Sequence, residues 1–199
     1  MSTTLLLKEL AKNWREIGAV APSSVFLTEK MLSVIDFASA CTVVELGAGT
    51  GVMTREMLKR LSSKGTLTVF ELNKNFCNAL RKEKDARLSV HCLSAEKLHA
   101  MLPESSVDVV LSGLPLLVLP KERVRSILEA IQKTLSPKGV FVQFQYSLAS
   151  RKLLLRHFQT VDVYFVSRNI PPAFVYVCSS GTPSRKRRSF HNIFERQNT

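Results

Sequence analysis

The segment that most constrains the fold is the stretch Val43-Val44-Glu45-Leu46-Gly47-Ala48-Gly49-Thr50-Gly51. The apolar run from Thr42 to Leu46 has the composition of a β-strand that is buried on both faces. Three glycines at alternate positions follow, and apolar residues then recur at spacings of three and four over residues 52–61, which predicts a helix. Glycines suit a turn that takes positive φ or approaches a ligand, because a Cβ atom would clash there. The stretch therefore predicts a strand, a tight turn and a helix whose free N–H groups can receive a polar ligand.

The spacing of the glycines indicates which ligand the turn receives. Folds that bind dinucleotides use G-x-G-x-x-G, whereas Gly47, Gly49 and Gly51 form a G-x-G-x-G pattern that follows Glu45. The pattern E-x-G-x-G-x-G resembles the first motif of class I methyltransferases, which use S-adenosylmethionine (SAM). This resemblance implies a Rossmann-like α/β fold, with a seven-stranded, mostly parallel sheet and helices on both faces. A glycine-rich loop in another doubly wound fold is the alternative.

A second acidic residue favours SAM over that alternative. Thr66 to Phe70 is predicted as the next strand, and Glu71 stands at its C-terminal end. A carboxylate at this position can accept hydrogen bonds from both hydroxyl groups of a ribose. The glycines are therefore preceded by one acidic residue and followed by another at the distance that SAM binding requires.

Composition narrows the class of protein. A chain of 199 residues can form one domain with a sizeable core, and no run of 18 or more apolar residues predicts a membrane-spanning helix. The net charge of +12 predicts a polyanionic partner, either nucleic acid or an anionic lipid surface. No C-x-x-C pair occurs, so we expect no metal site and free thiols in a reducing compartment. The four cysteines are Cys41, Cys77, Cys92 and Cys178.

The N-terminal segment predicts a short basic amphipathic helix over residues 5–17, from Leu5 to Ile17. Its apolar residues recur at helical spacing and include Trp14, the one tryptophan of the chain, whereas its lysines fall largely on other faces. Such a helix can lie in a membrane interface, and an ordinary helix packed on the domain fits the same pattern. The tail over residues 179–199 has the composition of a flexible end. Its basic run Arg185-Lys186-Arg187-Arg188 can bind an anionic membrane, bind RNA or stay solvated.

Four further stretches occur in order along the chain. They are Asn13-Trp14-Arg15 with residues 18–24, Ser112-Gly113-Leu114-Pro115, Gln143-Phe144-Gln145-Tyr146 and Arg168-Asn169-Ile170-Pro171-Pro172-Ala173. Together they resemble bacterial soluble-type phospholipid N-methyltransferases, which methylate the amine of phosphatidylethanolamine. The resemblance spans residues 8–178 and departs at Gln145, where that family has a threonine. It implies that residues 1–24 form a membrane-docking helix and a segment that covers the cofactor, residues 25–178 the methyltransferase domain and residues 179–199 the tail.

The periodicity of the rest of the chain predicts its other elements. Helices are expected over 25–38, 73–81, 121–135 and 148–158, and strands over 88–93, 107–111, 140–144, 161–166 and 174–178. The last strand is expected to run antiparallel beside the fifth, as in the class I methyltransferase fold. Ser136-Pro137-Lys138-Gly139 predicts a turn before the fifth strand.

The resemblance also implies further contacts to SAM. Ser94 and Ala95 follow the third predicted strand, where many SAM enzymes carry an acidic residue that meets the adenine amine. Ser94 replaces the usual aspartate, so the serine, Glu96 or backbone atoms would accept the adenine N–H. Ser112 ends the fourth predicted strand, which in this fold lies over the methyl sulfonium.

Two residues after late strands are candidates for contact with the substrate. Tyr146 is expected to orient the amine through its hydroxyl group or its ring. Arg168 is expected to bind the lipid phosphate, because a guanidinium group matches phosphate oxygens.

We therefore expect a SAM-dependent phosphatidylethanolamine N-methyltransferase of phosphatidylcholine biosynthesis, cytoplasmic and peripheral on the cytosolic face of the membrane. An RNA methyltransferase similar to rRNA adenine N6-dimethylases shares the glycine motif and tolerates the basic charge. Such enzymes usually carry Asn/Asp-Pro-Pro-Tyr where this chain has Ser112-Gly113-Leu114-Pro115. A second alternative is a protein of this fold that binds membrane or RNA without catalysis.

Overall fold

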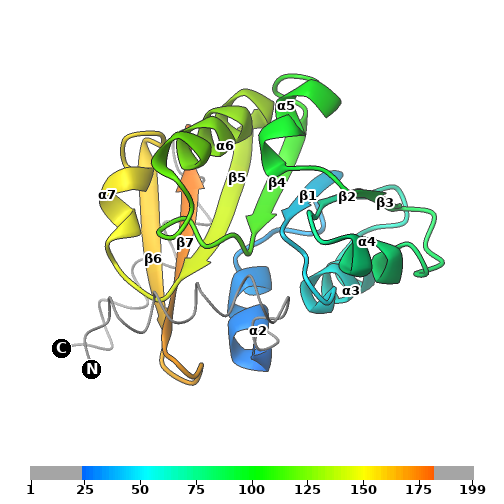
Figure 1. The fold of residues 1–199 in the computed structure, drawn as a ribbon, viewed down its shortest axis with the longest axis horizontal. Coiled ribbons are helices and arrows are strands. Elements are labelled where there is room, and N and C mark those ends of the chain that lie inside the picture. The colour runs from blue at the N-terminus through cyan, green and yellow to red at the C-terminus, as the bar shows by residue number, and fades with distance from the viewer. Residues whose placement is uncertain (1–23, 182–199) are drawn as a thin grey trace.

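The structure, a computed structural model, describes residues 24–181 (Figure 1). Its centre is one seven-stranded sheet with the strand order β3-β2-β1-β4-β5-β7-β6. Strands β1 to β5 pair in parallel, and β7 runs antiparallel between β5 and β6. This confirms the predicted α/β fold with a mostly parallel sheet. The strands are β1 (Thr42–Leu46), β2 (Thr66–Phe70), β3 (Leu88–His91), β4 (Val107–Ser112), β5 (Leu135–Gln145), β6 (Thr160–Val166) and β7 (Ala173–Ser179).

Helices cover both faces of the sheet, as predicted. One apolar cluster contains side chains of α2, α3 and α4, and the cluster on the other face contains side chains of α5, α6 and α7. Val43 belongs to the first cluster and Val44 to the second, and both are fully buried, which explains the uninterrupted apolar run in β1. The helices are α2 (Val25–Ser33), α3 (Val52–Arg60), α4 (Lys74–Leu80), the 3-10 helix η1 (Ala95–Lys97), α5 (Leu98–Met101), α6 (Lys121–Thr134) and α7 (Ser150–Leu154).

The strand directions bring several turns to one edge of the sheet, which we call the carboxyl edge. Strands β1 to β6 all end there, so the turns that follow them lie along the same rim. The start of α2 joins this rim because Ser24 Oγ donates a hydrogen bond to Asn169 Oδ1 in the β6–β7 turn, at 2.6 Å. Figure 1 shows α2 and the end of the β6–β7 hairpin at the same end of the molecule. Ligands of open parallel sheets bind at this edge.

Some element boundaries differ from the prediction. The expected turn over Ser136-Pro137-Lys138-Gly139 lies inside β5, because Leu135 already pairs with Val107 and the register then shifts before Val109. A Cβ atom at Gly139 would lie 2.8 Å from the Val107 carbonyl oxygen, so glycine lets the two strands approach at this irregularity. The helices expected over 25–38 and 148–158 are shorter, and β7 includes Ser179, which was expected to begin the tail.

The cysteines also differ from the prediction of free thiols. Cys77 on α4 and Cys92 after β3 form a disulfide, whereas Cys41 is exposed and Cys178 is buried as a free thiol. The two paired residues lie far apart in sequence relative to a C-x-x-C motif, so no local pattern indicates the pairing. Within residues 24–181, no group of three or more His, Cys, Asp or Glu side chains could hold a metal ion, and no helix is long and apolar enough to cross a membrane.

Two predicted segments lie outside the described residues. They are the amphipathic helix over residues 5–17 and the basic run Arg185-Lys186-Arg187-Arg188.

Candidate functional site

The turn between β1 and α3 has the conformation that its glycines predict. Gly47, Gly49 and Gly51 have φ values of 75°, 54° and 80°, in the left-handed region. An added Cβ atom would lie 2.8 Å from Leu114 Cδ2 at Gly47 and 2.5 Å from Leu80 Cδ2 at Gly51. At Gly49 the same position has no neighbour within 4 Å among the described residues. The turn therefore packs closely at its two ends and leaves its middle open to a ligand at the start of α3.

Glu45 lies beneath this turn and is only 2% exposed. Thr54 Oγ1 on α3 donates a hydrogen bond to Glu45 Oε2 at 2.5 Å. Burial raises the pKa of the Glu45 carboxyl to about 7; the hydrogen bond from Thr54 opposes the rise, and the nearby negative charge of Glu71 adds to it. The structure thus places this predicted cofactor residue where it ties β1 to α3.

Glu71 joins the turns that follow β1 and β2. Its Oε2 atom accepts the Gly49 backbone N–H at 2.9 Å, and its Oε1 atom accepts the Asn73 backbone N–H at 2.8 Å. Asn73 in turn caps α4, since its side-chain oxygen accepts the N–H groups of Asn75 and Phe76. The carboxylate therefore lies beside the open middle of the glycine turn, at the position expected for the residue that binds the ribose of SAM.

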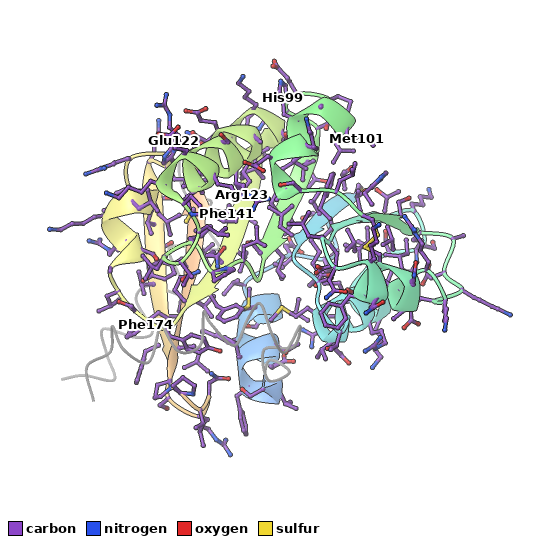
Figure 2. All side chains as sticks on the ribbon, viewed as in Figure 1. His99, Met101, Glu122, Arg123, Phe141 and Phe174 are labelled. Carbon is purple, nitrogen blue, oxygen red and sulfur yellow. A yellow bond between two sulfur atoms is a disulfide. The ribbon has the colours of Figure 1, made fainter. Side chains whose placement is uncertain are left out.

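Ser94 and Glu96 lie at the next turn along the edge and contact α6. Ser94 Oγ donates to Glu96 Oε2 at 2.7 Å, and Arg123 Nε donates to the same carboxylate oxygen at 3.2 Å. Figure 2 shows Arg123 on α6 at the centre of the molecule. Ala95 is buried in the core cluster beneath this turn. The Ala95 side chain therefore packs in the core, and a contact from Ala95 to adenine would use backbone atoms.

Ser112 ends β4 and starts a loop that packs against the glycine turn. The Ser112 Oγ atom accepts the Leu114 backbone N–H at 3.2 Å, and the Gly113 N–H donates to the Leu46 carbonyl at 2.9 Å. The Leu114 carbonyl accepts hydrogen bonds from Gln143 Nε2 at 2.9 Å and from Gln145 Nε2 at 3.0 Å. Two buried amides from β5 thus fix the loop over the cofactor turn.

Tyr146 and Asn169 lie next to this loop, beyond the ends of β5 and β6. Tyr146 is half-buried, and its ring meets the edge of the Phe144 ring at a centroid distance of 5.7 Å. Burial raises the pKa of the Tyr146 hydroxyl, and a hydrogen bond with the Asn169 side chain opposes the rise. Asn169 is buried and also donates through Nδ2 to the Pro171 carbonyl at 2.6 Å.

Arg168 lies at the outer side of the same turn rather than beside Tyr146. Its guanidinium carbon is 4.0 Å from the centroid of the Phe26 ring on α2. The structure therefore brings Glu71 to the glycine turn and Ser112 to the loop beside it, whereas Arg168 lies farther out on the rim. Gln143, Gln145 and Asn169 are not among the predicted site residues, although all three lie within the stretches that resemble the phospholipid N-methyltransferases.

Comparison with known proteins agrees with this geometry. The family described as Methyltransferase domain matches residues 43–139. An ornithine lipid N-methyltransferase of Singulisphaera acidiphila is 31% identical over 180 residues, which cover 87% of this chain and 94% of that protein.

Solved structures show the same fold. A 1,6-didemethyltoxoflavin N1-methyltransferase of Burkholderia thailandensis, with its ligand and S-adenosylhomocysteine bound, superposes with a TM-score of 0.69 at 16% identity, over 90% of this chain and 88% of that chain. Spermidine synthase of Thermotoga maritima has a TM-score of 0.61 at 17% identity, over 80% of this chain and 62% of its own.

The sheet order is that of the class I methyltransferase fold, and the glycine turn and Glu71 lie together at its carboxyl edge. The 31% identity over nearly all of its relative shows that this chain belongs to the family of SAM-dependent methyltransferases that includes the Singulisphaera enzyme. SAM is its cofactor. The predicted family, fold class and cofactor are therefore confirmed.

Proposed function

We propose that this enzyme transfers methyl groups from SAM to the amine of a membrane lipid. The match to the ornithine lipid N-methyltransferase over 94% of that protein carries the proposal. Phosphatidylethanolamine with its methylated forms is one candidate substrate, which would place the enzyme in phosphatidylcholine biosynthesis. An ornithine lipid is the other. Both headgroups present a primary amine, so the same transfer serves either.

We place the substrate amine beside Gln143, Gln145, Tyr146 and Asn169, and call this the acceptor position. The groups there suit an amine that binds in its neutral form. A primary alkylammonium has a pKa near that of lysine and must lose its proton before it attacks the methyl group. Gln143, Gln145 and Asn169 carry no charge, and the raised pKa of Tyr146 keeps its hydroxyl protonated at neutral pH. Tyr146 therefore orients the amine and does not act as the base. The partly buried setting and the positive sulfonium of bound SAM both disfavour an ammonium ion.

Catalysis then depends chiefly on positioning. The sulfonium of SAM is a good leaving group, so the protein needs to align donor and acceptor and to exclude water. The loop over Ser112-Gly113-Leu114-Pro115 touches the glycine turn directly, which suits it to set the distance between acceptor and methyl group.

We also propose where in the cell the enzyme acts. We propose a cytoplasmic enzyme that binds the cytosolic face of the membrane through the helix over residues 5–17 and the basic run Arg185-Lys186-Arg187-Arg188. The net charge of +12 supports an anionic surface as partner.

Transfer of labelled methyl from SAM tests the proposal. Phosphatidylethanolamine, its monomethyl and dimethyl forms and an ornithine lipid are offered separately in vesicles that contain anionic lipid, with bulk RNA in a parallel reaction. Label in a lipid fraction is the expected result, and the ranking of the lipids identifies the substrate. Label in RNA with none in lipid would refute the proposal and favour the RNA methyltransferase alternative.

Arg168 offers a second way to separate the two lipids. Ethanolamine is attached through a phosphodiester, whereas ornithine is an amino acid, so a phosphate-binding arginine matters only for the former. If phosphatidylethanolamine is the substrate, Arg168→Gln should raise KM for it and leave SAM affinity unchanged. An unchanged KM would show that Arg168 does not bind the phosphate of the substrate.

A further inference from the structure

The exposed apolar side chains of the described region are unevenly distributed. Eleven large apolar side chains are exposed within residues 24–181. Two of them, Met101 and Leu155, lie at the ends of helices that lead toward the opposite edge of the sheet. The remaining nine lie at strand ends, in the turns of the carboxyl edge or at the start of α2. The apolar exposure is therefore concentrated on the rim that surrounds the cofactor and acceptor positions.

The three most exposed members, Ile170, Val25 and Phe165, lie together with Phe26 at one end of this rim, and we call these four side chains the hairpin patch. Ile170, in the β6–β7 turn, is 93% exposed, and Val25, the first residue of α2, is 80% exposed. The hydrogen bond from Ser24 to Asn169 brings these two segments together. Arg168 stacks on Phe26 within the patch, so a cation lies among the apolar side chains.

The charge around the patch identifies its partner. Two cationic side chains lie where α2 meets the β6–β7 hairpin: Arg168 stacks on Phe26, and Lys30 Nζ on α2 is 4.2 Å from the centroid of the Tyr164 ring on β6. An apolar surface among cationic side chains is complementary to an anionic bilayer, which accepts apolar groups below its headgroups and attracts positive charge. RNA would match the charge but would leave Ile170 and Val25 exposed to water.

We infer that the hairpin patch is a bilayer-docking surface that places the acceptor position against the lipid headgroups. The inference rests on the proposed lipid substrate. Asn169 connects the two functions, because it bonds both to Ser24 at the patch and to Tyr146 at the acceptor position. An amine whose acyl chains stay in the bilayer can then reach the site without leaving the membrane. This surface lies within the domain and is separate from the helix expected over residues 5–17.

Vesicle binding by the full chain tests the inference. The vesicles contain phosphatidylcholine and phosphatidylglycerol in equal parts, with no methyl acceptor and no SAM. Ile170→Ser should weaken binding about threefold, and Ile170→Ser with Val25→Ser about tenfold, because each removes an apolar group that inserts. Met101→Ser is the matched control, since Met101 is 44% exposed and Figure 2 shows it at the far end of the molecule from Phe174 near the hairpin. This control should bind like the unaltered protein.

Three outcomes would overturn the inference. They are unchanged vesicle binding by the double variant, an equal loss with Met101→Ser, and conversion of a dimer to a monomer by the double variant without loss of vesicle binding. Thermal unfolding and SAM affinity of the double variant, both expected to match those of the unaltered chain, separate loss of docking from misfolding. Because these vesicles hold no substrate, failed methyl transfer together with intact, patch-dependent binding would refute the proposed function and leave the docking surface standing.

Discussion

Glu71 and Gly49 are joined by a hydrogen bond of 2.9 Å between the Glu71 carboxylate and the Gly49 backbone N–H. The two residues belong to turns that follow different strands. The bond therefore sets the distance between the glycine turn and the carboxylate that is expected to bind the ribose. This contact within the protein therefore fixes the position of the Glu71 carboxylate, and a carboxylate can also accept a hydrogen bond from a ribose hydroxyl.

Removing the charge of Glu71 should weaken SAM binding. Hydrogen bonds to charged groups contribute about 1.5–3 kcal/mol, so Glu71→Gln should raise the Kd for SAM about tenfold or more. Calorimetric titration with SAM measures this change. Glu129→Gln is the matched control, because it removes a carboxylate from an exposed ion pair with Arg125 on α6. Equal affinities of the Glu71 variant and this control for SAM would show that Glu71 does not bind the cofactor.

Glu45 should make stability depend on pH. Its folded pKa of about 7 lies above its ordinary value of 4.5, so the folded state binds the proton more tightly. The resulting stabilisation is complete below pH 4.5 and is lost as the pH rises through 7. Relative to Glu45→Gln, the unaltered protein should lose about 3 kcal/mol of unfolding free energy between pH 4.5 and pH 8. Urea unfolding of both proteins across this range measures the difference, and parallel pH profiles would contradict the prediction.

Gln145 should affect turnover more than cofactor binding. Gln145→Ala removes one of the two side-chain hydrogen bonds to the Leu114 carbonyl, which also accepts the Leu116 backbone N–H, and loosens the loop beside the acceptor position. A neutral hydrogen bond contributes about 0.5–1.5 kcal/mol, so kcat should fall about two- to tenfold while the Kd for SAM stays constant. Steady-state kinetics and SAM titration together check this split. A variant with unchanged kcat would show that Gln145 is not needed to position the loop.

Tyr146 and Asn169 should act together. Tyr146→Phe keeps the ring contact with Phe144 but removes the hydroxyl that bonds to Asn169, so kcat should fall about tenfold. In a double-mutant cycle, Asn169→Ala should cause little further loss in the Tyr146→Phe background. Methyl transfer by the four proteins gives the coupling energy. Full activity of Tyr146→Phe, with unchanged affinity for the lipid, would refute the orienting role.

The sequence predicts those parts of the fold that arise from local patterns. The apolar run of β1, the three glycines and the periodicity of α3 lie next to one another in the chain, and each appears as predicted. The irregularity in β5 is missed because proline and glycine at 137 and 139 have the composition of a turn. Only the pairing of Leu135 with Val107 shows that the strand has already begun.

The candidate site shows the same difference between residues indicated by local sequence patterns and residues placed by contacts distant in sequence. The position of Glu71 beside the glycine turn is predictable, because a carboxylate at the end of the second strand of this fold commonly faces that turn. Asn169 owes its role to Ser24, 145 positions earlier, and to Tyr146 beyond the end of β5, so no spacing in the sequence indicates it. Arg168 was expected at a lipid phosphate, and its stacking on Phe26 depends on how α2 packs beside the hairpin.

The two amides on the Leu114 carbonyl affect how the active site treats an amine that is methylated more than once. A carbonyl oxygen has two lone pairs, and the Leu114 oxygen already accepts hydrogen bonds from Gln143 Nε2, Gln145 Nε2 and the Leu116 backbone N–H. An amine loses one N–H donor with each methyl group it gains, so a vacant carbonyl would release each successive product more readily. A saturated carbonyl has no preference among primary, secondary and tertiary amines. The Leu114 carbonyl therefore does not set the number of methyl groups that the enzyme adds.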